Sequence, residues 1–271
     1  MISPDGAVER AAESEAARSS AEEPARRRLL RVAEQLFAEH GFKGVSVRAL
    51  TAAAGVNLAG VNYYFGSKEG LLAAIFDAHC RPMAEERLAR LALCAERPGA
   101  PPLLEQIIAA FIGPALASAA DGSGGGASFT RLRAVLAHEN NGLAKRLIAE
   151  HFDATSRRFI DALAGAAPHL DRAEVFWRFQ FLLGALYYTM MTPDRIRHLS
   201  EGVCDPAEVA RAEDEMVRFL AAGFRAPAGL PQGMANDRLL PLPASRDGAG
   251  MRRHRSRASG KGRAASDGSS S

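Results

Sequence analysis

The amino-acid sequence predicts an all-α fold, and three observations lead to this prediction. Apolar residues recur three and four positions apart through most of the chain, as in Leu29, Ala33 and Phe37, which is the spacing of one buried helix face. No segment shows the sustained alternation of apolar and polar residues that a half-buried β-strand needs. Glycines that can stop a helix, such as Gly41 and Gly55, follow the apolar stripes.

A first helix is predicted from Pro24 to Gly41. Proline fits the first helical position, where its missing N–H is not needed, and glycine fits the position just past the end. Residues 1–23 are mainly Ala, Ser and Glu with almost no large apolar side chains, so we expect a disordered acidic arm. Residues 226–271 are rich in Pro, Gly, Ser and Arg, and we expect them to form a disordered basic tail.

Two short helices joined by a tight turn are predicted within residues 46–68. The Ser46 hydroxyl can cap the first helix by accepting a hydrogen bond from a backbone N–H two or three residues later. Gly55 can supply the left-handed backbone position at which this helix ends. Asn57 is then a suitable cap for a second helix that begins at Leu58.

The second of these helices has two different sides. Val61 and Phe65 lie four residues apart, so both point toward a core. The other side faces outward and has the character of a helix that enters a DNA major groove. It is made of Leu58, Ala59, Asn62 and Tyr63. The alternative is a helical hairpin that only packs against its own domain, which would leave Asn62 and Tyr63 without a role.

Five sequence blocks in this region resemble the helix-turn-helix of the TetR family of bacterial regulators. They are Gly41-Phe42, Ser46-Val47-Arg48, Ala54-Gly55-Val56, Tyr63-Tyr64-Phe65 and Ser67-Lys68-Glu69. The resemblance implies a three-helix DNA-binding domain over residues 24–72 and a helical effector-binding and dimerisation domain over residues 73–225. It further implies a homodimeric transcriptional repressor that a small apolar effector releases from a palindromic, double-stranded DNA operator.

The chemistry of the DNA grooves assigns roles within this motif. Asn62 can pair with the edge of adenine, and Leu58 or Ala59 can touch a thymine methyl group. Tyr63 suits a phosphate, as do the helix starts at Ser46 and Lys68. Family members often carry a polar residue where Leu58 stands, so readout here is expected to rely more on methyl contacts and DNA shape. The predicted DNA contacts are Ser46, Val47, Arg48, Leu58, Ala59, Asn62, Tyr63 and Lys68.

The chain's formal net charge of +3 is unevenly distributed. The seven basic and three acidic residues of 24–72 give this segment a charge of +4, as expected of a module that contacts phosphates. The three arginines Arg26, Arg27 and Arg28 either contact flanking phosphates or form a solvated helix start. The basic tail, likewise, either adds nonspecific phosphate affinity or only solubilises the protein.

Two late apolar segments are interpreted as a dimer face. Residues 172–191 are apolar nearly all round and include Phe176, Trp177 and Phe181, which is more than one buried stripe requires. Residues 206–223 add a second apolar helix. TetR-like proteins dimerise through four such helices, and the alternative is a core helix of a monomer. Blocks such as Ala167-Pro168-His169-Leu170 resemble the PsrA-like branch of the family, which implies a fatty-acid-like effector.

A ligand pocket is predicted among the central helices. Its expected lining combines aromatic and apolar side chains with an arginine and a tyrosine as polar anchors. The residues are Phe111, Phe129, Arg133, Phe152, Tyr187 and Met190. An aromatic-rich core without a ligand is the alternative.

The sequence contains no HExxH, CxxC, GxSxG or glycine-rich phosphate-binding motif, so we expect neither enzyme activity, nor a cofactor, nor a metal site. Cys80, Cys94 and Cys204 are interpreted as reduced, buried thiols. No apolar run is long enough to span a membrane and no signal peptide is recognised, so a cytoplasmic protein is expected. A helical protein–protein adaptor and a small-molecule-converting helical enzyme remain alternatives to the regulator.

Overall fold

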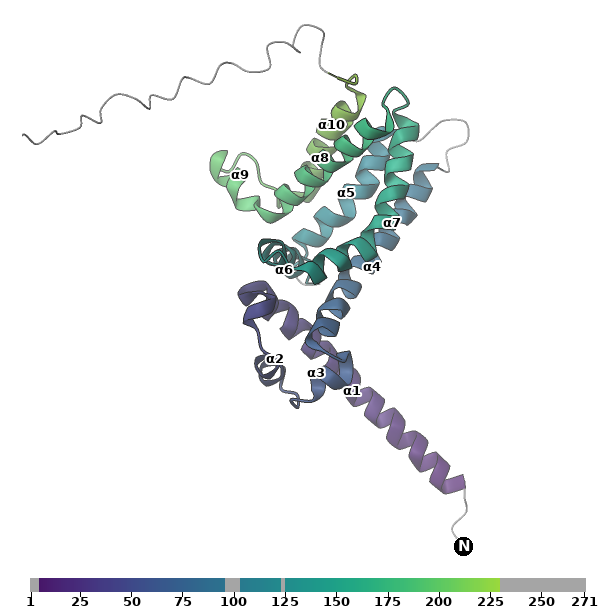
Figure 1. Cartoon of the computed structure of the whole chain (residues 1–271), viewed down its shortest axis with the longest axis vertical. Coiled ribbons are helices and arrows are strands. Elements are labelled where there is room, and N and C mark those ends of the chain that lie inside the picture. Colours follow the sequence, from purple (N-terminus) through teal and green to yellow (C-terminus); the bar gives the residue numbers. More distant parts are fainter. Residues whose placement is uncertain (1–4, 96–102, 123–124, 230–271) are drawn as a thin grey trace, which may run out of the picture. The chain divides into compact units, whose positions relative to one another are not determined.

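The computed structural model describes residues 5–95, 103–122 and 125–229, with side chains from residue 24 onward. Every regular element in these ranges is a helix, which confirms the all-α prediction (Figure 1). The helices are α1 (Asp5–Gly44), α2 (Val47–Ala54), α3 (Gly60–Phe65), α4 (Lys68–Ala95), α5 (Leu104–Ala120), α6 (Gly126–His138), α7 (Gly142–Ala166), α8 (Arg172–Met191), α9 (Pro193–Leu199) and α10 (Val209–Arg225).

The first helix differs from the prediction at its start. α1 begins at Asp5 and carries Pro24 inside it, so residues 5–23 are helical where a disordered arm was expected. Alanine and glutamate favour helix without needing buried surface, so a composition that cannot form a core can still form a helix. Gly41 interrupts α1 with φ 75° and ψ 164°, close to the predicted stop. Most of the predicted basic tail, residues 230–271, lies outside the described residues.

The turn between α2 and α3 is built by the predicted caps. The Ser46 hydroxyl accepts a hydrogen bond from the Ala49 N–H at 3.1 Å, and Gly55 adopts the left-handed conformation with φ 61°. Asn57 also acts locally, because its side-chain oxygen accepts from the Ala59 N–H at 3.0 Å. The helix does not start at Leu58 as predicted, however. Residues 57–60 form a tight turn first, and α3 begins at Gly60.

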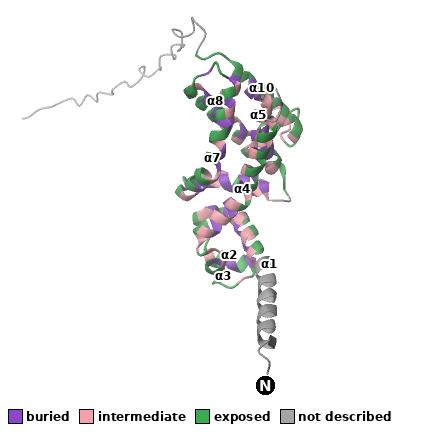
Figure 2. Ribbon diagram, turned by 90° about the vertical axis from the view of Figure 1, so that its right-hand side faces the viewer, coloured by how far each residue is buried: buried purple, intermediate pink, exposed green. Residues whose placement is uncertain are grey.

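One apolar core orients the three N-terminal helices. Helix α4 contacts α1 and α3, and α2 contacts both α1 and α3. The side chains between them are almost completely buried. They are Leu29, Phe37, Leu50, Val61, Leu71 and Phe76. Figure 2 colours the buried stretches of the ribbon purple. Val61 is therefore anchored as predicted, whereas Phe65 is only half-buried beneath the guanidinium of Arg26, at 5.2 Å from the ring centre.

Helix α5 is the centre of the C-terminal half, because it packs against α4, α6, α7, α8 and α10. Phe111 of α5 makes edge-on ring contacts with Phe159 of α7 at 5.0 Å and with Phe179 of α8 at 5.1 Å. Aromatic pairs of this geometry contribute somewhat more than their buried area alone. These rings fix α7 and α8 against α5.

Helix α6 joins the two halves, since it packs closely against α1. The Phe42 N–H, just after the Gly41 kink, donates to the Glu139 carboxylate at 3.3 Å. On α4, His79 Nε2 lies 2.9 Å from Glu34 Oε2 of α1, and its ring stacks on Phe129 of α6 at 4.4 Å. These contacts connect α6 to α1, to α4 and to the residue that follows the Gly41 kink.

We predict that Gly41→Ala lowers the free energy of unfolding by about 1–3 kcal/mol, because φ 75° with ψ 164° is a region that only glycine occupies without strain. A methyl group here would also collide with Glu139. Urea denaturation followed by circular dichroism measures this effect. Gly165→Ala is the matched control, because that helical glycine has nothing within 4 Å of a built Cβ. Equal stabilities of the two variants would contradict the prediction.

Candidate nucleic-acid interface and ligand-binding region

The outward side of α3 and of the turn before it is open to solvent. Tyr63 is 68% exposed and Leu58 is 53% exposed, and Ala59 and Asn62 are also exposed. Directly behind them Val61 is fully buried. The short helix is therefore packed against the domain on one side and exposes polar and apolar side chains on the other. This is the geometry of a recognition helix. The four predicted groove-facing residues are therefore all exposed.

The start of α2 offers a second free surface. Ser46 and Arg48 are exposed, while Val47 is half-buried and packs against the core. The first backbone N–H groups of a helix carry a partial positive charge and attract anions. Arg48 adds a full charge there, so this helix start suits a phosphate.

Arg26 and Arg28 make contacts within the chain. Arg26 lies over the ring of Phe65, and the Arg28 Nε–H donates to the Ala54 carbonyl at the end of α2, at 3.4 Å. A cation at a helix C-terminus is favourable because it meets the negative end of the helix dipole. These arginines thus help to hold α2 and α3 in place, which neither of the sequence-based interpretations included.

Lys68, predicted to face DNA, is directed toward its own domain. Its ammonium group donates to the Val45 carbonyl at 2.6 Å and lies 4.3 Å from the ring centre of Phe42. Partial burial lowers the pKa of Lys68, with Glu69 and Glu139 acting in the opposite direction. The Lys68 side chain thus connects the start of α4 to the loop before α2. Its ammonium group is used for a hydrogen bond inside the domain and does not point toward DNA as predicted.

Five of the six predicted pocket residues lie in one region, together with a second arginine. Arg133 lies 4.6 Å from the ring centre of Tyr187, 5.9 Å from that of Phe129 and 6.0 Å from that of Phe152. Phe111 is buried beside them, and Met190 is half-buried one turn beyond Tyr187.

The second arginine, Arg87, was not predicted. It is 4% exposed, its Nε–H donates to the Phe111 carbonyl at 2.8 Å, and its guanidinium carbon lies 3.9 Å from the Phe111 ring centre. Burial lowers the pKa of Arg87 to about 10. The sequence did contain a signal, since Arg87 follows Cys80 and Met83 at the i, i+3, i+7 spacing of the buried stripe.

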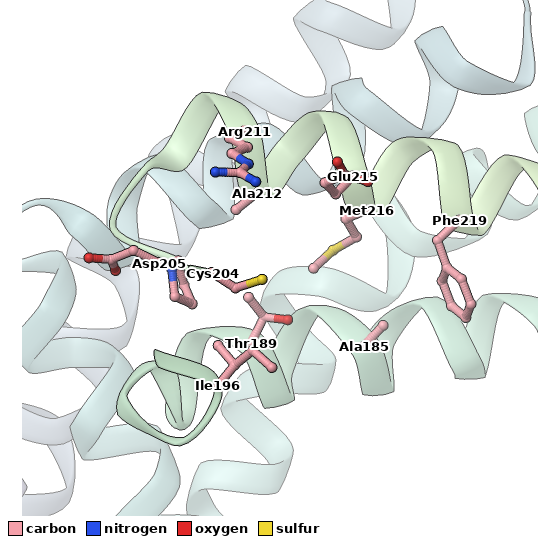
Figure 3. Close-up of a pocket in the computed structure, with 11 residues that line it drawn as sticks. Ala185, Thr189, Ile196, Cys204, Asp205, Arg211, Ala212, Glu215, Met216 and Phe219 are labelled. Atoms are coloured by element: carbon pink, nitrogen blue, oxygen red, sulfur yellow. The ribbon is translucent and has the colours of Figure 1, made fainter. Parts of the chain in front are cut away.

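The predicted dimer face is exposed and aromatic. On α8, Trp177 is 62% exposed and Phe181 and Tyr188 are also exposed, and on α10 Phe219 is 72% exposed. Between these helices lies an open groove of about 380 Å³, in which Phe219 points toward the helix that carries Ala185 (Figure 3). An exposed apolar surface of this extent marks an interaction site.

The thiols differ from the prediction at one position. Cys80 is buried, and burial raises its pKa to about 12, while Cys94 is half-buried. Cys204 is exposed, because it lies in the loop between α9 and α10 and not on a helix face.

Among the described residues no group of His, Cys, Asp and Glu side chains could hold a metal ion. No helix within the described part of the chain is long and apolar enough to cross a membrane.

We predict that Lys68→Met lowers the free energy of unfolding by about 1–3 kcal/mol, since the Val45 carbonyl loses a charged hydrogen-bond donor while the aliphatic packing is retained. The measurement is urea denaturation at neutral pH. Lys43→Met, which removes an exposed lysine in the same segment, is the control and should change little. If both variants unfold like the wild type, the inward role assigned to Lys68 is wrong.

Two family profiles match the chain in succession. Residues 29–75 match the profile "Bacterial regulatory proteins, tetR family", and residues 109–223 match "Tetracyclin repressor-like, C-terminal domain". The chain is also 38% identical over 60 residues to the HTH-type transcriptional repressor AcnR of Corynebacterium glutamicum. That match spans 22% of this chain and 32% of the relative.

Solved structures share the fold. The fatty acid degradation regulator FadR from Bacillus halodurans is 17% identical, with a TM-score of 0.54 over 74% of this chain and 97% of that one. A structure assigned as a transcriptional regulator from Pseudomonas aeruginosa PAO1 is also 17% identical, with a TM-score of 0.51 over 74% and 91% of the two chains. Membership of the PsrA-like branch stays a prediction. The two family profiles together show that the chain belongs to the TetR family of bacterial regulatory proteins.

Proposed function

We propose that the protein is a homodimeric transcriptional repressor that binds a palindromic DNA operator and is released from it by a small effector. The observation that carries this proposal is the exposed outer surface of α3 with Val61 buried directly behind it. In this proposal residues 24–72 bind DNA, residues 73–225 bind the effector and dimerise, and the protein acts in the cytoplasm. No catalytic role is proposed.

Each exposed residue of the proposed DNA-binding surface has a role that suits its chemistry. Asn62 pairs with an adenine edge in the major groove, and Leu58 and Ala59 contact thymine methyl groups. Tyr63 and Arg48 contact phosphates on either side, and Ser46 presents the start of α2 to the backbone. Lys68 contributes mainly by holding α4 against the loop before α2.

A second copy of the chain is proposed to cover α8 and α10. The exposed rings of Trp177, Phe181 and Phe219 would pack against their symmetry mates in a four-helix arrangement. A two-fold dimer places two copies of α3 so that they can reach two half-sites one helical turn apart, or a multiple of that. The dimer is therefore needed for tight and specific operator binding.

Release from DNA is proposed to be a shift between two conformations. An effector that fits only one spacing of the two DNA-binding segments favours that spacing, and the operator favours the other. The described contacts give two routes between the ligand region and the DNA-binding segment. One runs along α4 from Arg87 to Lys68, and the other runs through α6 to Glu139 and Phe42.

We predict that Asn62→Ala weakens binding to the specific operator by about 5–150-fold, the equivalent of about 1–3 kcal/mol for one base pairing. Binding to random DNA should change far less. Fluorescence anisotropy with labelled duplexes from the DNA upstream of the gene measures both. The result that contradicts the proposal is a wild-type affinity that does not depend on the DNA sequence.

Arg48→Ala belongs to the same experiment and should weaken binding to all sequences about equally. It should also reduce the slope of log affinity against log salt by about 1, because one phosphate contact is lost. Arg157→Ala is the matched control, since Arg157 is an exposed arginine of α7 with only a 3.9 Å ion pair to Asp153. Equal salt slopes for the wild type and Arg48→Ala would remove Arg48 from the interface.

We predict that Phe219→Asp converts the dimer to a monomer at micromolar concentration, because it places a charge in the apolar face. Sedimentation velocity gives the mass, and operator affinity should fall together with it. Leu93→Asp is the control, since Leu93 is a similarly exposed apolar residue of α4 outside the proposed face. A wild-type protein that sediments as a monomer, or a Phe219→Asp variant that sediments as a dimer, would refute the proposed interface.

A further inference from the structure

The ligand region contains two buried positive charges that come from different helices. Arg87 of α4 is 4% exposed and Arg133 of α6 is 8% exposed. Both guanidinium groups approach the ring of Phe152, at 5.4 Å and 6.0 Å from its centre. Arginines are almost never this buried unless they are paired.

Within the described part of the chain neither arginine has an acidic partner. The Nε–H of Arg133 is buried and donates no hydrogen bond. Arg87 donates only to the Phe111 carbonyl, and the groups that influence its pKa are Tyr187, Arg133 and Cys80, none of which is a carboxylate. A buried charge without a counter-charge is strongly unfavourable, and removing one partner of a buried pair is among the most destabilising changes known.

The neighbouring groups cannot supply the missing negative charge. Burial raises the pKa of the Cys80 thiol to about 12, so it stays neutral at physiological pH. The pKa of Arg87, although lowered to about 10, still leaves this side chain charged. The faces of Phe111 and Tyr187 attract the cations, but this attraction is weaker than that of a hydrogen-bonded anion.

We propose that Arg87 and Arg133 bind the anionic head of the effector, which is a small organic acid with an apolar body. The inference rests on the proposed ligand-responsive function and names the chemical class of the ligand. The planar forks of the two guanidinium groups match the oxygens of a carboxylate or of a phosphate monoester. The rings of Phe111, Phe152 and Tyr187 supply the apolar surroundings of the ligand body.

An approach for the ligand lies at the end of α8. Met190, three residues after Tyr187 and on the same helix face, lines an open hollow of about 250 Å³ together with Leu116, Ala119 and Thr189. Tyr187, whose ring lies over Arg133, and Met190, which lines the hollow, are both half-buried. The apolar body would then extend from the arginines toward this hollow.

The test is a thermal-shift measurement on the full chain with matched probes. Hexanoate, decanoate, hexadecanoate and phenylacetate are each compared with the alcohol of the same skeleton, and decyl phosphate is compared with decanoate. At least one acid should raise the melting temperature in a concentration-dependent way, as expected of a ligand that binds the native state. Its alcohol should raise it much less. A larger shift with decyl phosphate than with decanoate assigns the site to phosphate monoesters and also supports the proposal.

Arg133→Met is the principal variant. Without ligand it should melt at the same temperature as the wild type or higher, because an unpaired buried charge has been removed. The shift caused by the acid should be lost. Arg133→Lys keeps the charge but loses the planar fork of donors, so its shift should be smaller than that of the wild type. If Arg133→Met does not fold, an undiminished shift with Arg133→Lys overturns the proposal. Arg131→Met is the control, since Arg131 is an exposed arginine of the same helix, and its shift should equal that of the wild type.

The proposal is overturned if every acid and its alcohol give equal shifts, or if Arg133→Met keeps the full shift with the acid. Operator binding, measured separately by anisotropy, distinguishes this failure from failure of the proposed function. An acid that stabilises the protein without changing operator affinity supports the anion site and refutes ligand-controlled release. A chain that binds no operator refutes the repressor, while the thermal shifts still decide whether the anion site exists.

Discussion

The structure depends on the burial of one side chain behind a very short helix. Helix α3, Gly60–Phe65, has six residues, and isolated helices shorter than about 12–15 residues are marginal in water. Its orientation therefore comes from Val61, which is fully buried in the core shared with α1 and α4. Because that residue fixes the helix from one side, the opposite side can present Asn62 and Tyr63 to solvent at a defined angle. The caps at Ser46 and Gly55 set the direction from which the chain enters this position.

Helix α6 is the element through which the ligand region can influence the DNA-binding segment. Arg133 and Phe129 lie on it next to the aromatic cluster, and Phe129 also stacks on His79, which pairs with Glu34 of α1. At its end, Glu139 accepts a hydrogen bond from Phe42. A coupling free energy between two sites is typically about 1–3 kcal/mol, which is the size of one or two such hydrogen bonds. In the proposed mechanism, the gain or loss of one or two contacts of α6 would therefore supply enough free energy to couple the two sites.

Features that local residue chemistry determines could be predicted from the sequence, whereas features that depend on tertiary packing could not. The caps, the Gly41 interruption and the burial of Val61 follow from residue types and spacing. The inward direction of Lys68 could not be predicted, because its acceptor, the Val45 carbonyl, lies 23 residues away. Arg87 was missed for a similar reason: only the fold shows that α5 and α7 close over it. The early start of α1 escaped prediction because low apolar content was taken as disorder although alanine and glutamate favour helix.

The described part of the chain has three unfavourable features, namely two exposed apolar surfaces and one pair of unpaired buried charges. Binding of a partner would remove each of them. Apolar and aromatic tips are exposed on α3, a wider aromatic face is exposed on α8 and α10, and two arginines are buried without acids between them. Stable folds violate such rules mainly where function requires it. DNA would satisfy the first of these sites, a second copy the second, and an organic acid the third. Helix α4 packs against α3 and also carries Arg87, so in the proposed mechanism this helix couples the first site to the third.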